Sequence, residues 1–478
     1  MTMAGPAPIR EAPTAPGADL TPTCFRLLLA GLLAAAAALG SFRLGTPSVW
    51  LDEAVSWFNS SGSWERVCQR ALATDDMGGV VYAPLLKVWL AAAGDSEAAM
   101  RLPSVAATIA LVAVMAYIAR LLWDRRASVA VGVLTLFHPS VLTASRQARG
   151  YIFLLLFSAL GLLGLAWQLG RARRAGHVLL GVAGLAVAAT HIFGVLVTIG
   201  TAAASALLAR HAARGGPPAG PPRRGPVVRA LLPFLPAGLF AAVWVALEAR
   251  MVARRLAVFW VPGPLWRNGV VVLVLMVGPI VAGSAVVWAT RATARAREVA
   301  LGLIVVAVPV FAGLLVVSLV ARGHHNFVTV RYALPLVLPG ALGCGYAVSR
   351  LRLAPAAAVL AIGAALSVGH AASHNAWAST ARGGQEIRDA AAFLRSHVQP
   401  GEAVVAMPVW EWFSLSYYRV PNVRELPPAR PAGADAGAPG GPTWRVVFYP
   451  DPKRPPAPVP GLATWRFGTL RIERWPRP

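Results

Sequence analysis

Ser48-Val-Trp-Leu-Asp52-Glu53-Ala-Val-Ser-Trp57 follows directly after the first long apolar run of the chain. The chain has only 20 acidic residues among 478, so two adjacent carboxylates beside an apolar run require an explanation. An ionised side chain next to the hydrocarbon region of a membrane is costly and is by default a sign of function. The pair therefore directs attention to chemistry at a membrane surface.

The composition is that of an integral membrane protein. Hydrophobic residues make up 56% of the chain and charged residues 13%, and the mean hydropathy is +0.59, whereas soluble domains carry about 25% charged residues. The net charge of +24 comes almost wholly from arginine in short loops between apolar runs, which indicates membrane topology rather than nucleic-acid binding. The three cysteines have no metal-binding or redox spacing.

Runs long enough to cross a bilayer, which takes about 20 mainly apolar residues, recur along most of the chain. We predict an α-helical polytopic membrane protein with about eleven transmembrane helices, at residues 25–42, 101–123, 127–143, 151–168, 177–190, 192–209, 230–248, 268–289, 299–320, 332–349 and 354–371. A cleaved signal peptide is the alternative for the first run, and we interpret that run as a retained span.

Arginine-rich segments fall in alternate loops, and the positive-inside rule assigns these loops to the cytoplasm. Residues 1–20 are then a disordered cytoplasmic leader, and residues 21–371 form the membrane module. The loop at 45–100 and the tail at 372–478 face outward from a cytoplasmic (plasma) membrane. Within the loop we predict short interfacial helices at 54–58, 64–72 and 80–93, because these segments are rich in Trp and Tyr.

The tail is richer in Pro, Gly and charge than the rest of the chain. Its segment Gln385 to Ser396 has the spacing of an amphipathic helix, and strand-like runs follow at 403–407, 444–449 and 469–472. We predict a small soluble α/β domain on the extracytoplasmic side.

Asp52 and Glu53 are the first candidates for catalysis. Consecutive side chains on a helix point about 100° apart, so only one of the two can face a given reacting atom. Partial desolvation suits a carboxylate to work as a general base. The alternative is that both acids only stabilise the first turn of an interfacial helix.

Three arginines depart from the positive-inside pattern, namely Arg146, Arg149 and Arg331. Guanidinium groups at an outer membrane surface can hold a phosphate through paired hydrogen bonds. Snorkelling to lipid headgroups is the alternative for each of them. Because Tyr151 and Tyr332 follow two of them closely, we predict a binding site for an anionic, lipid-linked ligand.

Two further cationic or titratable residues are weaker candidates for this ligand site. His191 falls at the outer end of a span and could be a packing residue, a hydrogen-bond donor to a phosphate or a metal ligand. Lys87 lies among aromatic residues in the same loop as the acid pair. Its side chain could contact a phosphate or anchor the loop at the membrane interface.

An ordered set of short motifs resembles the GT-C glycosyltransferases that use polyprenyl-phosphate sugars, in particular the protein mannosyltransferase and aminoarabinose lipid A transferase type. The resemblance rests on Trp50-Leu-Asp-Glu-Ala54, Tyr82-Ala-Pro84 with Leu85 to Trp89, Gly94 to Ser104, Ser145 to Tyr151, Thr190-His191, and Arg331-Tyr332 with Pro335. Together these motifs span residues 45 to about 340. The doublet of prolines usual before the Leu-Tyr helix is absent, and the tail has no diagnostic motif.

The resemblance implies a GT-C fold and a sugar transfer with inversion at the anomeric carbon. Asp52 would deprotonate an acceptor hydroxyl of a protein, lipid or glycan, while Arg149 and Arg331 would stabilise the departing lipid phosphate. Glu53 is left with three roles, as ligand of a divalent cation, orienting partner or helix cap. A transporter or flippase of lipid-linked sugars is the rival function, but such proteins tend to have repeated halves, and we find no internal repeat here.

Overall fold

The structure is a computed structural model, and several segments of the chain lie outside its described part. It describes residues 19–73, 79–170, 172–214, 225–255, 265–290, 293–320, 328–374, 386–407, 412–424, 443–448, 461–468 and 470–475. The predicted leader at 1–20 therefore lies outside the described residues except for its last two positions.

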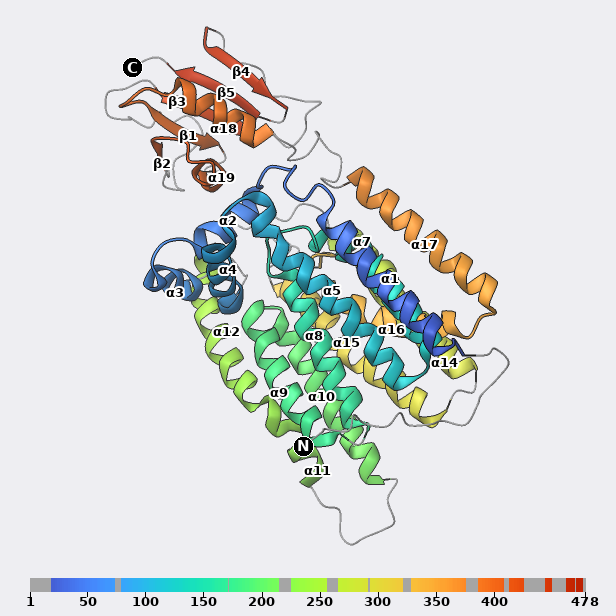
Figure 1. Cartoon of the computed structure of the whole chain (residues 1–478). Coiled ribbons are helices and arrows are strands. Elements are labelled where there is room, and N and C mark those ends of the chain that lie inside the picture. Colours follow the sequence, from blue (N-terminus) through green and yellow to red (C-terminus); the bar gives the residue numbers. More distant parts are fainter. Residues whose placement is uncertain are drawn as a thin grey trace.

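A bundle of helices forms the larger part of the molecule (Figure 1). Its helices are α1 (Pro22–Ser41), α5 (Glu97–Leu122), α6 (Arg125–Leu136), α7 (Pro139–Ala144), α8 (Tyr151–Gln168), α9 (Arg173–Thr190), α10 (Gly194–Arg214), α11 (Gly225–Leu231), η1 (Leu232–Phe234), α12 (Leu235–Arg255), α13 (Leu265–Val272), η2 (Leu273–Val277), α14 (Gly278–Ala289), α15 (Ala294–Val320), η3 (Leu334–Leu336), α16 (Val337–Ser349) and α17 (Leu353–His374).

Eight helical stretches in the described part of the chain are long and apolar enough to cross a membrane. The predicted number of eleven is therefore not confirmed, and three predicted spans account for the difference. The run at 127–143 is broken into α6 and α7 at Pro139, whose ring cannot continue the preceding helix. Most of the run at 332–349 is helical as η3 and α16, but this helical stretch, Leu334–Ser349, is shorter than the eight. The run at 177–190 belongs to α9, which begins with two arginines and is less apolar than the eight.

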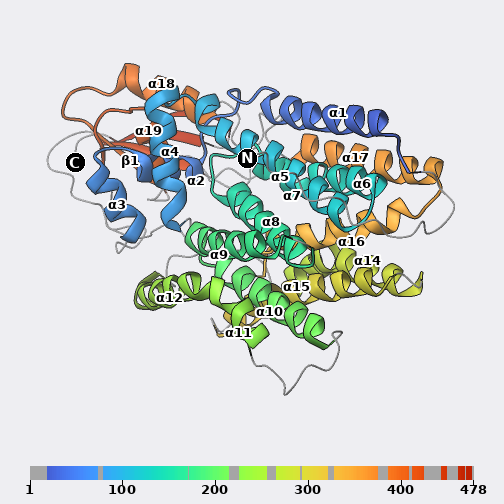
Figure 2. The ribbon, with the colours of Figure 1, turned by 60° about the horizontal axis from the view of Figure 1, so that its bottom comes forward.

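Helix α8 occupies the middle of the bundle (Figure 2). In the apolar stretch of α8, 78% of the residues are buried inside the protein. In the apolar stretch of α17 the buried share is 6%, so that helix faces outward. Helices that are apolar on all sides are buried or in contact with lipid. The position of α8 matters for function because its first residue, Tyr151, directly follows the link from Ser145 to Gly150.

The loop between α1 and α5 contains three short helices, α2 (Leu51–Ser60), α3 (Trp64–Ala73) and α4 (Gly79–Ala93). These helices confirm the helical segments predicted for this loop. Ser96 caps the next helix, α5, by accepting a hydrogen bond from the Ala99 N–H. The loop therefore ends at a defined point, directly before the long helix α5.

The tail forms a five-stranded sheet and two helices, α18 (Glu386–His397) and α19 (Trp412–Tyr417). Its strands are β1 (Ala403–Met407), β2 (Val423–Arg424), β3 (Thr443–Phe448), β4 (Ala463–Phe467) and β5 (Leu470–Trp475), in the order β2-β1-β3-β5-β4. Strand β1 is parallel to both of its neighbours, and β5 is antiparallel to both of its own. Helix α18 buries one apolar face, as its spacing predicts.

The sheet lies at the same end of the bundle as α2, α3 and α4 (Figure 1). Aromatic rings join the two parts: Phe58 of α2 lies 5.3 Å from Trp412 and 5.1 Å from Phe413 of α19, measured between ring centroids. The acidic pair in α2 is therefore placed between the end of the bundle and the tail.

Candidate active site

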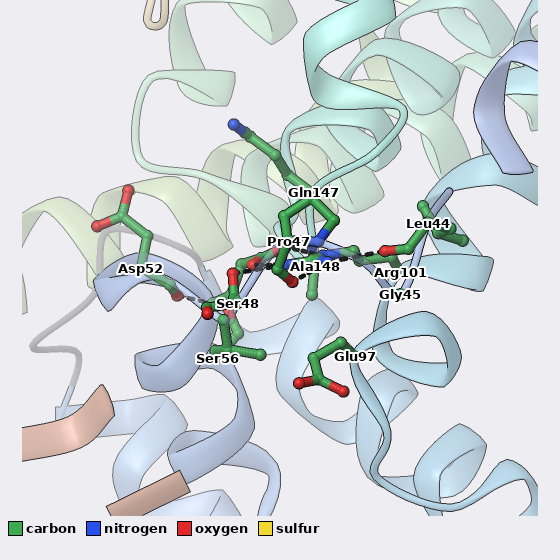
Figure 3. A network of polar contacts seen from close by, with 12 residues as sticks. Leu44, Gly45, Pro47, Ser48, Asp52, Ser56, Glu97, Arg101, Gln147 and Ala148 are labelled. Carbon is green, nitrogen blue, oxygen red and sulfur yellow. Dashed lines mark hydrogen bonds and ion pairs between the residues drawn. The ribbon is translucent and has the colours of Figure 1, made fainter. Parts of the chain in front are cut away.

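Asp52 and Glu53 stand in the first turn of α2 but have different surroundings. The Glu53 side chain is 1% exposed, whereas that of Asp52 is 21% exposed. Figure 3 shows the carboxylate of Asp52 directed away from Arg101 and its network. The turn of about 100° between neighbouring helical residues explains the separation. Of the two carboxylates, only that of Asp52 is therefore open to solvent.

The carboxylate of Glu53 is fully occupied by protein groups. Arg101 of α5 donates from Nε to Oε1 at 2.8 Å and from Nη2 to Oε2 at 2.6 Å. The N–H of Ala148 also donates to Oε1, at 2.9 Å. A buried carboxylate requires this degree of compensation. Glu53 thereby connects α2 to α5 and to the link before α8.

Arg101 also fixes the chain that leads into α2. Its Nη1 atom donates to the carbonyls of Leu44 and Pro47 at 2.8 and 2.9 Å. Its Nη2 atom donates to the carbonyl of Ser48 at 3.0 Å (Figure 3). Because these carbonyls belong to the segment that leads into α2, the guanidinium group is one of the contacts that hold the chain before the helix.

Asp52 forms an ion pair with Arg331, which lies 279 residues further along the chain. Arg331 Nη1 stands 3.1 Å from Asp52 Oδ2, and the side chain of Arg331 is 46% exposed. The guanidinium carbon lies 5.6 Å from the ring centre of Trp50 and 5.7 Å from that of Tyr151. Two aromatic rings and one carboxylate thus hold a cation that solvent can still reach.

Arg149 approaches the same place from the link before α8. Its Nη1 atom donates to the main-chain carbonyl of Asp52 at 3.0 Å and to Ser56 Oγ at 3.3 Å. Its guanidinium carbon lies 5.6 Å from the ring centre of Tyr151. Tyr151 is therefore shared by two guanidinium groups, those of Arg149 and Arg331.

His191, in the turn between α9 and α10, is the last member of the cluster. Its ring centre lies 5.9 Å from that of Tyr151, 5.7 Å from that of Tyr332 and 5.6 Å from that of Phe193. Its Nδ1 atom accepts a hydrogen bond from the Phe193 N–H at 3.2 Å. Burial, together with the two nearby guanidinium groups, lowers the pKa of His191 to about 3. The ring is therefore neutral at physiological pH.

Two other predicted cations have contacts elsewhere. Lys87 donates to the carbonyl of Gly62 and lies 5.3 Å from the ring centre of Trp64. Arg146 donates to the carbonyl of Leu39 at 2.8 Å, near the end of α1. These contacts resemble an interface anchor for Lys87 and a helix cap for Arg146. Of the eight predicted site residues, five are linked by the contacts described above, namely Asp52, Arg149, Tyr151, Arg331 and His191, and Tyr332 joins them through His191. Glu53 follows Asp52 in the chain but contacts Arg101 and Ala148 instead.

The sequence-based prediction assigned no role to Arg101. The available signal was an arginine at the start of a predicted span, since such a residue needs a partner of opposite charge. The structure identifies that partner as Glu53.

A cation site at Glu53 does not fit its surroundings. Within the described ranges, no three His, Cys, Asp or Glu side chains come together so that they could hold a metal ion. Each carboxylate oxygen of Glu53 already accepts from a nitrogen of Arg101. We therefore derive no chemical step through a cation at this residue.

The fold is that of the GT-C membrane glycosyltransferases, which confirms the resemblance in the motifs at the level of the fold. In particular, the chain is similar to the aminoarabinose lipid A transferase ArnT from Cupriavidus metallidurans. The TM-score is 0.59 with 14% identity to ArnT bound to undecaprenyl phosphate, over 95% of this chain and 98% of that chain. It is 0.60 with 15% identity to apo ArnT, over the same shares of both chains. No protein-family model and no curated protein matches the sequence.

Proposed function

We propose that this protein is a membrane glycosyltransferase that moves a sugar from a polyprenyl-phosphate donor to an acceptor hydroxyl, with inversion, at the outer face of the cytoplasmic membrane. The observation that carries the proposal is the partly exposed ion pair of Asp52 and Arg331 at 3.1 Å, with Arg149 beside it. ArnT, which has the same fold, is bound to undecaprenyl phosphate in one of its structures. A carboxylate base next to two guanidinium groups suits a sugar donor that carries an anionic lipid phosphate.

Asp52 is the proposed general base. Its carboxylate takes the proton of the acceptor hydroxyl, and the hydroxyl oxygen attacks the anomeric carbon of the sugar. The bond between that carbon and the phosphate oxygen breaks, so the electron pair leaves with the lipid phosphate monoester. A single displacement inverts the anomeric centre. Phosphate is a good leaving group, so this scheme needs no strong general acid.

Arg331 and Arg149 are proposed to bind the donor phosphate. Charge on that phosphate grows as the sugar departs, and fixed guanidinium groups stabilise growing charge. Arg331 is 46% exposed, so its guanidinium group is accessible to a phosphate. Arg149 is anchored at its Asp52 and Ser56 contacts, which keep it close to the base.

Glu53 has a supporting role in this proposal. Its bonds to Arg101 and to the Ala148 N–H tie α2 to the bundle. The carboxylate acts by holding the helix that carries Asp52, and it does not contact the substrate. Of the three roles considered for Glu53, that of orienting partner agrees best with these contacts.

The orientation in the membrane is proposed from the arginine pattern, with the N-terminus inside and the tail outside. The tail contacts α2 directly, so Asp52 and the tail belong to the same side. The acceptor can then be a protein, lipid or glycan of the cell envelope.

The test is transfer of radiolabelled sugar from undecaprenyl-phosphate donors to envelope acceptors by membranes that contain wild type or Asp52→Asn. We expect transfer by the wild type, loss of transfer in Asp52→Asn, and retained binding of undecaprenyl phosphate by that variant. Asp95→Asn is the matched control, because Asp95 pairs with Arg419 at 3.3 Å on the exposed side of the tail interface. Undiminished transfer by Asp52→Asn would remove Asp52 as the base. Movement of labelled lipid across proteoliposomes without transfer would favour a flippase.

A further inference from the structure

The start of α2 depends on contacts from outside the helix. The helix has ten residues, and its N-cap residue Trp50 makes no side-chain capping bond. Helices of this length are marginal by themselves, and their first N–H groups need partners. The position of Asp52 in the first turn therefore depends on what holds the preceding residues.

Tyr418, which follows α19 in the tail, holds one of these residues. Its hydroxyl accepts a hydrogen bond from the Val49 N–H at 2.8 Å and donates to Glu97 Oε1 at 3.1 Å. Val49 is fully buried, so its N–H has no access to water. Burial raises the pKa of Tyr418 to about 12, although the bond from Val49 lowers it. The hydroxyl therefore keeps its proton and can make both bonds.

Arg388 of α18 holds the same segment of chain at three more residues, Gly45, Thr46 and Ser48. Its Nη2 atom donates to Glu97 Oε1 at 2.8 Å and to the carbonyl of Gly45 at 3.0 Å. Its main-chain N–H donates to Ser48 Oγ at 3.3 Å. Glu97 thus receives bonds from both Arg388 and Tyr418, and all three belong to one network around residues 45–49.

The other end of α2 is held by the tail as well. The ring of Trp57 meets that of Tyr417 edge to face, with centroids 5.4 Å apart. Phe58 packs on the rings of α19, as described above. The tail therefore contacts α2 at its far end and the chain that leads into it, while Asp52 lies between these contacts.

We propose that the tail is a working part of the active site, in which Tyr418 is a positioning residue that holds Asp52 at the correct place through the main chain of Val49. This inference rests on the proposed function and adds a role for the tail to it. Tyr418 does not contact the reacting atoms. It acts on the base through Trp50 and Leu51, the two residues that separate Val49 from Asp52.

The expected size of the effect follows from the bond that is lost. In Tyr418→Phe the buried Val49 N–H has no acceptor from residue 418, and Glu97 loses a neutral donor. The loss of such a bond shifts an equilibrium or a rate by roughly tenfold. Binding of undecaprenyl phosphate should fall less than turnover, because Arg149 and Arg331 contact Asp52 but are carried by other elements of the chain.

Tyr417→Phe is a matched control on the neighbouring residue. The hydroxyl of Tyr417 donates to the carbonyl of Asp95 at 2.6 Å, before α5, and not to the chain before α2. The phenyl ring that remains keeps the contact with Trp57. The two variants lose the same atom from the same interface, and only Tyr418→Phe loses a bond to the segment that leads to Asp52.

The experiment makes two kinds of measurement on full-length protein in nanodiscs. The first is turnover with the radiolabelled undecaprenyl-phosphate sugar that the wild type uses, together with the Kd for undecaprenyl phosphate. We expect turnover to fall about tenfold in Tyr418→Phe with a smaller change in the Kd, and to stay at the wild-type level in Tyr417→Phe. An equal fall in both variants overturns the positioning role, because it would show a general effect of the interface.

The second measurement is hydrogen exchange of the main-chain amides at residues 49–54, which needs no substrate. We expect faster exchange in Tyr418→Phe only. Unchanged exchange overturns the inference, whatever the activity. If the wild type transfers no sugar while exchange changes as expected, the proposed function fails, but Tyr418 is still shown to position the start of α2.

Discussion

Arg101 and Glu53 form a two-bond ion pair at 2.8 and 2.6 Å, although their side chains are only 4% and 1% exposed. Removal of one partner of a buried pair leaves the other charge uncompensated, which costs about 3–5 kcal/mol. We therefore expect Glu53→Gln to lower the melting temperature strongly, or to prevent accumulation of folded protein. The measurement is thermal unfolding of the purified protein in detergent.

Asp52→Asn is the natural comparison for this prediction. Its ion pair with Arg331 is partly exposed, and exposed pairs contribute roughly 0–1 kcal/mol. We expect Asp52→Asn to unfold close to the wild-type temperature. Two neighbouring acids then give opposite results, one affecting the fold and the other the chemistry. Equal melting temperatures for Glu53→Gln and the wild type would contradict a structural role for the buried pair.

Arg331→Ala should weaken the binding of undecaprenyl phosphate. A charge-assisted hydrogen bond to a phosphate contributes about 1.5–3 kcal/mol, which corresponds to a loss of affinity of roughly 10- to 100-fold. The loss should decrease at high salt, because Arg331 is half exposed. Binding of the radiolabelled lipid phosphate at two salt concentrations measures both effects.

Arg350→Ala is the control for Arg331→Ala. Arg350 also pairs with an aspartate, Asp124, at 2.7 Å, and its guanidinium carbon lies 4.7 Å from the ring centre of Tyr346. It follows α16, whereas Arg331 precedes that helix, so the two arginines stand at opposite ends. Equal losses of affinity in the two variants would indicate nonspecific attraction of an anionic lipid.

His191 should make the fold less stable in acid. Its pKa in the folded protein is about 3, below the ordinary value of 6.5, because of burial and the nearby arginines. The unfolded chain therefore binds a proton below pH 6.5 that the folded protein does not bind. This stabilising contribution is present above about pH 6.5 and is lost as the pH falls, by about 2 kcal/mol between pH 7 and 5. Melting temperatures at pH 5, 6 and 7 measure the loss.

His191→Asn separates this contribution from other titrating groups. An asparagine oxygen can accept the Phe193 N–H in place of Nδ1, and asparagine does not titrate. We expect a lower melting temperature for this variant at neutral pH but a smaller decrease between pH 7 and 5. The same decrease in both proteins would show that His191 is not the residue responsible.

The local parts of the fold were predictable because they depend on short-range patterns. The apolar spacing from Gln385 to Ser396 predicted α18, and the run at 403–407 coincides with β1. The candidate cations and tyrosines were predictable for a similar reason, since charge at the outer end of an apolar run is visible in a single sequence.

Contacts between distant residues were not predictable in the same way. Glu53 and Arg101 are 48 positions apart, and Arg388 meets Glu97 across 291 positions. No local pattern indicates which acid pairs with which arginine, and composition alone cannot say which of two adjacent carboxylates faces inward. The break at Pro139 was visible in the sequence, but the apolar residues on both sides led to one predicted span.

Gly283→Ala should separate two helices that touch through their backbones. A Cβ atom at this position in α14 would lie 2.3 Å from the carbonyl carbon and 2.5 Å from the Cα of Gly343 in α16. Backbone atoms cannot rotate away as side chains do, so the helices must move apart, at a cost of about 1–3 kcal/mol. We expect a clearly lower melting temperature in detergent.

Gly363→Ala makes the same substitution where no neighbour interferes. A Cβ atom at Gly363, inside α17, would meet nothing within 4 Å. Alanine is a better helix former than glycine by about 1 kcal/mol, so this variant should be as stable as the wild type or more stable. The two substitutions differ only in their surroundings, and the sign of the change in melting temperature should differ between them. If both variants are stabilised, α14 and α16 are not in the close contact on which the prediction depends.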